Sequence, residues 1–322
     1  MSGHADVNCR VCRSVIANEP FEVREHYFGG NGRHRYVECE TCGTIQMVTF
    51  PPDIAAIYPP LYRPPFRVPG PIRRVLLRQR ANYVRGSRWN LLGRMLVSRY
   101  GSPDWADWMA VTRTPLDARI LDVGSSDGER VVALSAAGYR DVTGIDPYIA
   151  HDRVFPHGAR VVKRRLEDHV GEYDLVMLHH SLEHMPDPIQ GLAEVRRLLA
   201  PDGWALVRLP VAGGYGWRTY RENWFGLEPP RHLVIPSARG MELIAEAAGF
   251  AIVSTVYDGH GGYYAMGEAA LAGRDISGPR RPSLQRAAEM YGAAEIQRFR
   301  ALAAERNAVG DGDTAAFYLR PR

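Results

Sequence analysis

The sequence predicts an α/β protein built around a parallel sheet, with a small cysteine-rich module ahead of it. An apolar run at 120–123 is followed by a glycine-containing loop, a helical pattern at 131–137 and a second apolar run that ends at Asp146, which is the pattern of one βαβ unit. A further run at 173–178 is apolar without alternation, as expected of a strand buried on both faces. All four cysteines lie in the first 42 residues, in two Cys-x2-Cys pairs.

The length and composition indicate a globular protein. The 322 residues suffice for one domain of ordinary size and a small appendage, and 45% of them are hydrophobic and 24% charged. The net charge of +4 suits an anionic small molecule as well as nucleic acid and selects neither. Because no apolar window is long enough to span a bilayer and no signal-peptide pattern follows Met1, we expect a soluble, cytoplasmic protein without a membrane partner.

The cysteine pairs predict a structural zinc site in residues 1–50. Cys9, Cys12, Cys39 and Cys42 can place four thiolates tetrahedrally around one Zn²⁺, and a cytosolic chain would not normally use such pairs as disulfides. Gly43 permits the tight turn after the second pair. Short strand patterns between the pairs complete a zinc ribbon. Since four cysteines leave no open position on the metal, the zinc is expected to be structural, and two redox or unpaired cysteine pairs are the alternative.

Residues 51–114 are predicted to link this ribbon to the main domain. The first part is a strap with eight prolines between 51 and 71, and its Tyr58 and Tyr62 either cover the substrate or simply pack. The second part, 72–100, has helical apolar spacing and eight arginines. These arginines form either a phosphate-binding surface or a solvated helix face. The second interpretation is favoured because few aromatic residues are interleaved.

The loop of the βαβ unit predicts a nucleoside site without a pyrophosphate. Asp146 closes the second strand 22 positions after Gly124, where a carboxylate can hold the two hydroxyls of a ribose. Asp122 and Asp127 flank the loop glycines, and their charges would repel a pyrophosphate from the backbone N–H groups. A ligand with a ribose and a cationic end, such as S-adenosylmethionine, suits this loop better.

The segment D-V-G-S-S-D-G-E-R followed by G-I-D-P resembles motif I and the acidic second-strand end of the class I S-adenosylmethionine-dependent methyltransferases. It departs from the usual GxGxG loop at Ser126, which replaces the central glycine. The resemblance implies a seven-stranded Rossmann-like domain over residues 115–322 and S-adenosylmethionine as cofactor. The expected cofactor-binding residues are Asp122, Gly124, Ser125, Asp127, Gly128, Asp146, Leu166, Glu167 and His179. In the family, the position of Leu166 and Glu167 contacts adenine, and His179 is expected beside the sulfonium or the carboxylate of the cofactor.

The segment after the strand at 173–178 predicts the catalytic edge of the sheet, because ligands of open α/β sheets bind beyond the carboxyl ends of the strands. Here the chain reads H-H-S-L-E-H-M-P-D-P, which resembles the fourth-strand segment of many small-molecule methyltransferases. Three histidines within six residues can titrate near neutrality. His180 and His184 are therefore candidate bases. For Glu183 and His184 the alternative is capping of the following helix.

Residues 211–237 predict a lid over the substrate, because they are too many and too aromatic for a routine connection. The candidate substrate-binding residues are Tyr215, Trp217, Trp224 and Arg231. The run E-N-W-F-G-L-E-P-P-R-H-L resembles a segment of zinc-ribbon-bearing methyltransferases linked to sugar and polysaccharide decoration, in which Pro-Arg-His-Leu lies against the active site. His232 is therefore a third candidate base, and a buried structural histidine is the alternative.

The remaining chain is predicted to complete the sheet. Ser237 caps a helix that ends at Gly249, and 250–257 forms a sixth strand. After a Pro/Arg-rich break at 278–282, a helix runs to about residue 306. Residues 314–320 are expected to form a seventh strand, inserted antiparallel beside the fifth strand at 204–209.

These features favour a methyltransferase that acts on a small polar acceptor. The resemblance points to O-methylation of a sugar, a sugar nucleotide or a glycosylated or secondary metabolite. One alternative is an RNA or protein methyltransferase that binds its macromolecule through the ribbon and the arginine-rich helices. Another is a non-catalytic scaffold that binds a nucleoside without turnover. The sequence leaves the oligomeric state open.

Overall fold

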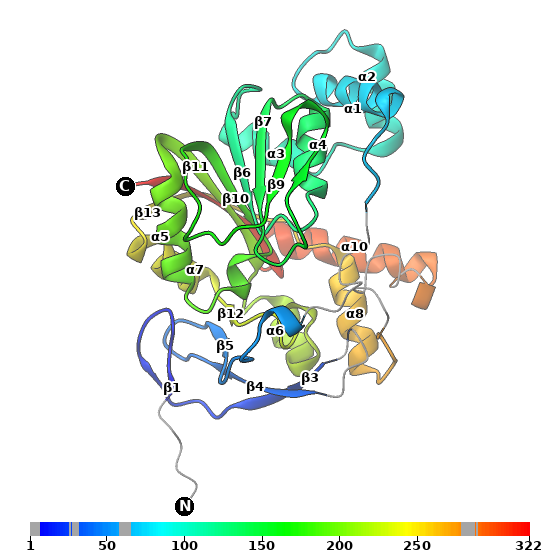
Figure 1. The fold of residues 1–322 in the computed structure, drawn as a ribbon. Coiled ribbons are helices and arrows are strands. Elements are labelled where there is room, and N and C mark those ends of the chain that lie inside the picture. Colours follow the sequence, from blue (N-terminus) through cyan, green and yellow to red (C-terminus); the bar gives the residue numbers. More distant parts are fainter. Residues whose placement is uncertain (1–6, 26, 28–31, 58–65, 278–286, 288) are drawn as a thin grey trace, which may run out of the picture.

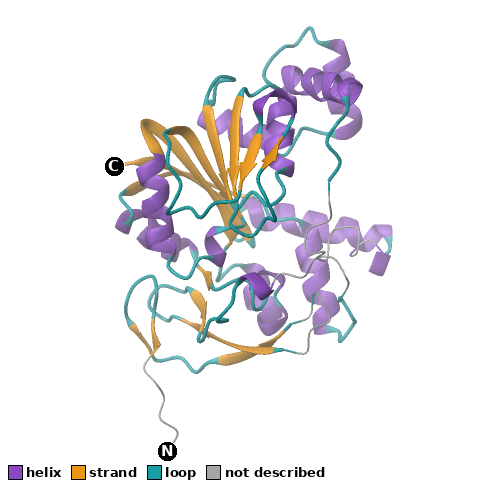
Figure 2. Ribbon diagram, in the orientation of Figure 1, coloured by secondary structure: helices purple, strands orange, loops and turns teal. Residues whose placement is uncertain are grey.

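The computed structural model describes residues 7–25, 27, 32–57, 66–277, 287 and 289–322 (Figure 1). A central sheet carries helices on both faces, and a smaller sheet lies below the ends of its strands (Figure 2). The predictions made for Tyr58, Tyr62 and the break at 278–282 fall outside the described residues. Among the helices that are described, none is long and apolar enough to cross a membrane.

The central sheet has the strand order β13-β14-β11-β10-β6-β7-β9-β8. Its parallel strands are β6 (Arg119–Val123), β7 (Asp141–Ile145), β9 (Arg160–Val162), β10 (Tyr173–His179) and β11 (Leu199–Pro210). β14 (Thr314–Pro321) lies antiparallel between β11 and β13 (Phe250–Tyr257), which confirms the inserted last strand. The described sheet has eight strands rather than the expected seven, because β8 (Arg153–Val154) adds an antiparallel edge too short to predict.

Alternate residues of β10 belong to two apolar layers. Val176 and Leu178 join the cluster of α5 (Pro188–Leu198) and α7 (Ala238–Ala247), whereas Leu175 and Met177 join that of α3 (Trp105–Thr112) and α4 (Glu129–Ala137). A parallel strand covered on both faces needs apolar side chains on both. The unbroken apolar run of the sequence follows from this burial.

The N-terminal ribbon, residues 7–50, is built from short strands. They are β1 (Val7–Asn8), β2 (Val15–Ile16), β3 (Phe21–Arg24), β4 (Arg33–Glu38) and β5 (Ile45–Met47). Gly43 makes the predicted turn with φ +68°, and its N–H donates to the Cys39 carbonyl at 2.7 Å. The outer strand beside β5 is β12 (Val234–Ile235), which comes from a distant part of the chain. The ribbon and this distant segment therefore share one sheet, across the boundary expected at residue 50.

The expected lid, 211–237, is a buried wedge rather than a cover over open space. It forms α6 (Tyr215–Tyr220), two turns of 3-10 helix and β12, and it packs against the ribbon and α8 (Gly261–Leu271). Trp217 is 1% exposed. The centroid of its ring lies 5.3 Å from that of Phe21 in the ribbon and 6.0 Å from that of Trp224. Its Nε1–H donates to Glu38. Trp217 therefore joins two parts of the molecule, which corrects its assignment to substrate.

The arginine-rich region forms two helices, α1 (Pro71–Val84) and α2 (Leu91–Tyr100). They cross at Gly93, where an added Cβ would lie 2.3 Å from the Gln79 carbonyl oxygen. α1 packs on α4 through the fully buried Ala81. Farther along the chain, α10 (Ala293–Ala308) packs against α8.

The burial of Trp217 predicts a stability effect. Trp217→Ala should lower the free energy of unfolding by about 3–5 kcal/mol, because the change removes a large buried ring and leaves a cavity. Chemical unfolding followed by circular dichroism measures this loss. Trp89→Ala is the matched control, since Trp89 is 95% exposed and should change stability little. Equal, small effects of both substitutions would contradict the junction role of Trp217.

Candidate active site

The glycine loop after β6 lies at the carboxyl edge of the sheet and requires its glycines. Gly124 and Gly128 have φ values of +73° and +92°. A Cβ on Gly124 would lie 2.7 Å from the Cβ of Ser181, and one on Gly128 would lie 2.6 Å from Val161. Ser126 adopts a left-handed conformation itself, with φ +49°. The serine that replaces the central glycine thus keeps the turn.

Asp146 lies directly beyond β7, as predicted. One of its carboxylate oxygens accepts the N–H of Ser126 at 2.9 Å and the other accepts the N–H of Tyr148 at 2.8 Å. These bonds fix the carboxylate, and each oxygen keeps a further lone pair that can accept a ribose hydroxyl. Ser125 is buried beside it, and its N–H donates to the Ile145 carbonyl.

The two other loop carboxylates are paired with arginines, which corrects the electrostatic argument from the sequence. Asp122 is fully buried and lies 3.3 Å from Arg130, and Asp127 lies 3.2 Å from Arg153. Because each negative charge has a cation beside it, the loop does not repel anions in the manner expected. The predicted preference for a cationic ligand therefore loses this support.

His179 ends β10 behind the glycine loop. Its ring is 2% exposed and lies 4.0 Å from the ring of Trp108. Burial, together with Arg130 and Arg208, lowers the pKa of His179 well below its ordinary value, so the ring is neutral. Both ring nitrogens lack a hydrogen-bond partner among the described residues.

Leu166 and Glu167 follow β9, the strand beside β7. Leu166 is buried, whereas the Glu167 side chain is 56% exposed and lies 3.5 Å from Arg165. The structure thus places both near the predicted edge but gives them different surroundings.

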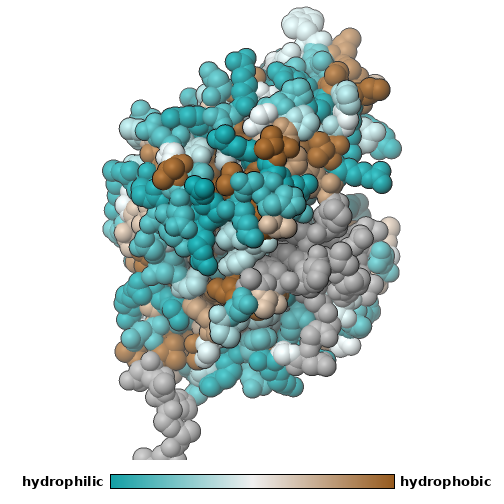
Figure 3. Space-filling view, viewed as in Figure 1, coloured by the Kyte–Doolittle hydropathy of each residue, from teal (hydrophilic) through white to brown (hydrophobic). Residues whose placement is uncertain are grey.

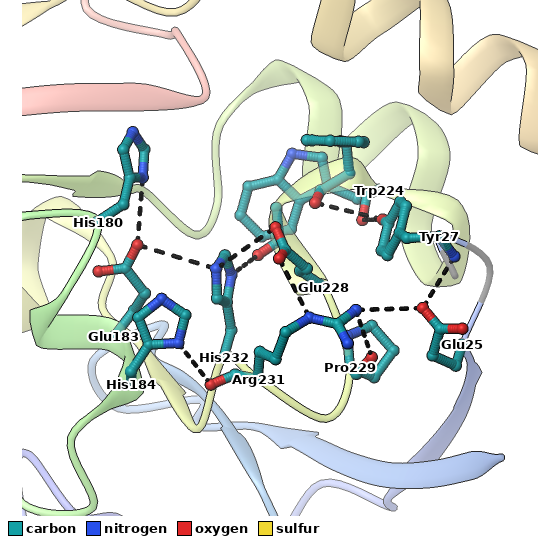
Figure 4. Close-up of polar contacts among 12 residues, drawn as sticks. Glu25, Tyr27, His180, Glu183, His184, Trp224, Glu228, Pro229, Arg231 and His232 are labelled. Atoms are coloured by element: carbon teal, nitrogen blue, oxygen red, sulfur yellow. Dashed lines mark hydrogen bonds and ion pairs between the residues drawn. The ribbon is translucent and has the colours of Figure 1, made fainter. Parts of the chain in front are cut away.

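His180 is the first member of a polar network that crosses the site (Figure 4). Its Nε2 accepts a hydrogen bond from Arg208, which also pairs with Asp258. An arginine can only donate, so the proton of the neutral ring lies on Nδ1, which donates to Glu183 at 3.2 Å. Because Arg208 already occupies the basic nitrogen of His180, this residue is poorly placed to act as the base.

His232 lies on the opposite side of Glu183 (Figure 4). Its Nδ1–H donates to the Gly226 carbonyl at 2.7 Å, which fixes the tautomer. Its Nε2 lies 3.9 Å from Glu183 and 3.8 Å from Glu228. Both carboxylates and the imidazole are almost fully buried, so water screens the interactions among these three groups little.

Arg231 connects this network to the ribbon. The side chain is 2% exposed, and it donates to Glu228 at 3.2 Å, to Glu25 of the ribbon at 3.1 Å and to the Pro229 carbonyl at 3.1 Å. Its donors thus serve buried protein groups, which corrects its assignment to substrate.

His184 packs edge-on against His232, with ring centroids 4.9 Å apart, and its Nδ1–H donates to the Arg231 carbonyl at 2.8 Å. One ligand atom each from Glu183, His184 and His232 lies within 4.8 Å of the others, so this group could also bind a metal ion.

A narrow pocket with room for about one water molecule opens beside His180 and His232. Trp224, Phe225, Tyr263 and Asp313 complete most of its lining. Trp224 is 1% exposed, and its Nε1–H donates to Asp313 at 2.9 Å, so only part of its ring borders the pocket. Tyr215 lies outside this lining and packs against Tyr264.

Comparisons with known proteins identify the family. Residues 98–255 match a family described as "Methyltransferase domain". The ubiquinone biosynthesis O-methyltransferase of Aromatoleum aromaticum is 32% identical over 108 residues, which are 30% of this chain and 46% of that protein. The 27-O-demethylrifamycin SV methyltransferase of Amycolatopsis mediterranei is 27% identical over 227 residues, covering 63% and 73% of the two chains. Residues 98–255 therefore form a domain of the methyltransferase family, in agreement with the resemblance of the glycine loop to the class I S-adenosylmethionine-dependent enzymes.

Among solved structures, a methyltransferase from Mesorhizobium loti matches 67% of this chain and 97% of its own, with 14% identity and a TM-score of 0.41. The chain spans about half of the length, or less, of the ubiquinone biosynthesis O-methyltransferases that it matches.

Asp313 is the residue of the methyltransferase site that sequence reasoning missed. It precedes β14, whose first residue pairs with Pro210 at the end of β11. Because β14 is antiparallel, its start lies at the same edge as the carboxyl ends of the parallel strands. An acidic residue just before an inserted antiparallel strand was therefore the available signal. Asp313 also accepts the N–H of Gly216 at 2.8 Å.

Burial raises the pKa of Asp313 to about 7, from an ordinary value near 4. The folded protein therefore retains this proton over a range where the unfolded chain loses it. The contribution of Asp313 to stability is largest below about pH 4 and falls as the pH rises to about 7, by about 4 kcal/mol at most. Comparing urea unfolding of the wild type with Asp313→Asn across this range isolates the effect. A difference between the two proteins that stays constant with pH would contradict it.

Proposed function

We propose that this methyltransferase transfers the methyl group of S-adenosylmethionine to a hydroxyl of a small polar acceptor, with His232 as the base. The observation that carries the proposal is that His232 lines the pocket, while its Nε2 lies 3.9 Å from Glu183 and 3.8 Å from Glu228. The bound cofactor would supply a methyl group on a sulfonium. His232 Nε2 would take the proton of the acceptor hydroxyl as that oxygen gains the methyl group, and the cofactor would leave as a neutral thioether.

The cofactor would lie along the edge formed by the loop at 124–128 and Asp146. The glycines allow close approach of a ligand, and the fixed carboxylate of Asp146 suits a ribose. One of the relatives named above is called an O-methyltransferase, and the name of the other gives a 27-O-demethylated compound as its substrate. Both names support a hydroxyl acceptor.

A sugar, a sugar nucleotide or a glycosylated or secondary metabolite is the acceptor class that we propose. The pocket lining combines the aromatic rings of Trp224, Phe225 and Tyr263 with polar groups of His180, His232 and Asp313. Rings that could cover the faces of a ligand and polar groups that could meet its hydroxyls suit a compact polyol, for which the pocket would have to widen.

The proposed base is tested with two matched substitutions. His232→Asn retains an amide that can donate to Gly226 but removes the proton acceptor, so kcat should fall by about 10²–10⁴-fold while the affinity for S-adenosylhomocysteine stays unchanged. His184→Asn is the control, because the amide can still donate to the Arg231 carbonyl while the ring beside His232 is removed, and it should retain most activity unless His184 binds a metal ion.

Methyl transfer to pooled small hydroxyl acceptors measures kcat, and calorimetry measures cofactor affinity. A full rate for His232→Asn would overturn the assignment of the base. Binding of S-adenosylhomocysteine without transfer to any acceptor would instead favour a non-catalytic scaffold. Loss of transfer on addition of a chelator that leaves the ribbon metal in place would favour a metal ion at Glu183, His184 and His232.

We also propose that the four cysteines bind one structural Zn²⁺. The Sγ atoms of Cys9 and Cys42 lie 3.6 Å apart and those of Cys12 and Cys39 lie 3.5 Å apart. Zn–S bonds of about 2.3 Å in a tetrahedron place sulfurs about 3.8 Å apart, so the observed spacing fits the ion. All four sulfurs lie within 4.8 Å of one another, as the ligands of a closed four-coordinate site must.

Zinc analysis tests this proposal. The purified protein should contain about one Zn²⁺ per chain, and Cys39→Ser should lose it, because a hydroxyl is a poor zinc ligand. The same change should lower stability, since the ribbon shares a sheet with β12. Ser14→Ala keeps all four sulfurs and should keep the metal. A wild-type protein that is free of zinc after reconstitution under reducing conditions would refute the site.

A further inference from the structure

The segment 67–103, which contains α1 and α2, concentrates the positive charge of the chain. It holds nine arginines and no aspartate or glutamate, whereas the whole protein has a net charge of only +4. These arginines are Arg67, Arg73, Arg74, Arg78, Arg80, Arg85, Arg88, Arg94 and Arg99. We call this segment the arginine hairpin. The rest of the chain is therefore net acidic.

One side of the arginine hairpin packs against the methyltransferase domain. Ala81 is fully buried against α4, and the guanidinium of Arg85 donates to the Ala137 carbonyl at 3.0 Å. Arg80 is also used internally, because it donates to the carbonyls of Tyr100 and Gly101. The hairpin is therefore a fixed part of the molecule, and the arginines that hold it are distinct from those on its surface.

The other side exposes large apolar side chains. The exposed fractions are 95% for Trp89, 79% for Ile72, 72% for Leu91, 60% for Met95 and 57% for Val75. Ile72 and Val75 lie one turn apart on α1, and Leu91 and Met95 lie one turn apart on α2. Figure 3 shows brown surface gathered over the part of the molecule where Figure 1 draws these helices. Such side chains are costly to leave in water unless something covers them.

Exposed arginines lie on the same two helices and their connection. They are Arg73, Arg88, Arg94 and Arg99. The feature is therefore neither a plain charged helix face nor a plain apolar patch. It combines apolar side chains with cations and contains no acidic residue.

The chemistry of the occupant follows from this combination. A second copy of the chain docked through the same hairpin is disfavoured because two strongly positive surfaces repel each other. RNA would match the charge, but aliphatic side chains such as Ile72, Leu91 and Met95 offer it neither hydrogen bonds nor stacking. An anionic bilayer surface matches both features, because its headgroups attract arginine and its acyl region accepts Trp and aliphatic side chains. The indole of Trp89 suits the interface between the two.

We propose that the arginine hairpin docks the methyltransferase on the surface of an anionic lipid bilayer. The helices lie on the surface and do not span it, in agreement with the lengths and composition of the described helices. The expectation from the sequence that the protein has no membrane partner rested on spanning segments alone, and this proposal departs from it. The proposal does not depend on the identity of the acceptor or on the role of His232.

Vesicle sedimentation tests the proposal with the full-length protein. Vesicles of phosphatidylcholine with about one third phosphatidylglycerol should bind the wild type, whereas pure phosphatidylcholine vesicles should bind it much more weakly, because the headgroup charge is one of two required signals. Salt at 0.5 M should release most of the bound protein. The Trp89→Phe variant should lose the blue shift of tryptophan fluorescence that accompanies binding of the wild type.

Three sets of substitutions separate the contributions. Ile72→Ser with Trp89→Ser and Leu91→Ser should weaken partitioning by about tenfold or more, since all three side chains leave water on binding. Arg73→Gln with Arg88→Gln and Arg94→Gln should abolish the preference for the anionic lipid. The control replaces Val253, Leu271 and Val309, which are exposed by 56%, 58% and 68% on other elements, with serine and should bind like the wild type. Each variant is compared only after its circular dichroism and binding of S-adenosylhomocysteine match those of the wild type.

The outcomes decide between occupants. Loss of vesicle binding in both hairpin variants with retention in the control supports the proposal. Binding of the wild type to RNA or to an acidic peptide, without binding to anionic vesicles, overturns it. Equal loss in the control variant also overturns it, because the effect would then not belong to the hairpin. Loss of methyl transfer in the His232 variant with intact vesicle binding would separate failure of the catalytic proposal from failure of this one.

Discussion

The arrangement of the site depends on the burial of one positive charge, the guanidinium of Arg231. It is 2% exposed and is neutralised by Glu228 on its own segment and by Glu25 of the ribbon. A buried guanidinium left without one of its partners would destabilise the fold by about 3–5 kcal/mol. Arg231 therefore ties the ribbon to the segment that carries His232. The ribbon cannot shift without uncovering a charge.

Two further contacts act on the same short segment. The Tyr36 hydroxyl donates to the His232 carbonyl at 2.9 Å, and the Met47 N–H donates to the Leu233 carbonyl at 2.9 Å. On the other side, the Leu233 N–H donates to the carbonyl of Glu183 at 2.7 Å. The segment is thus fixed between the ribbon and the loop after β10. Glu183 and His232 face each other because the backbone holds them at that separation.

Much of the fold could be predicted because its signals are local. The apolar run at 173–178, the turn at Gly43 and the acidic end of β7 each depend on a few neighbouring residues. The wedge at 211–237 could not be predicted as such. Its aromatic residues suggested a lid, but whether Trp217 faces a ligand or the ribbon depends on a contact with Phe21 nearly 200 positions away. Sequence composition reports that a residue is aromatic and does not report which surface it covers.

The site shows the same limit in its electrostatics. Asp122 and Asp127 read as an acidic loop because the sequence does not show that they pair with Arg130, eight positions from Asp122, and Arg153, 26 positions from Asp127. The three candidate bases look equivalent in the sequence, whereas their hydrogen bonds differ: Arg208 occupies the basic nitrogen of His180, and Gly226 fixes the opposite nitrogen of His232. A general base must hold its nitrogen close to one orientation, because small errors in position reduce the rate strongly. Glu25 and Tyr36 of the ribbon hold the segment that carries His232, so the ribbon would position the proposed base rather than contact the acceptor.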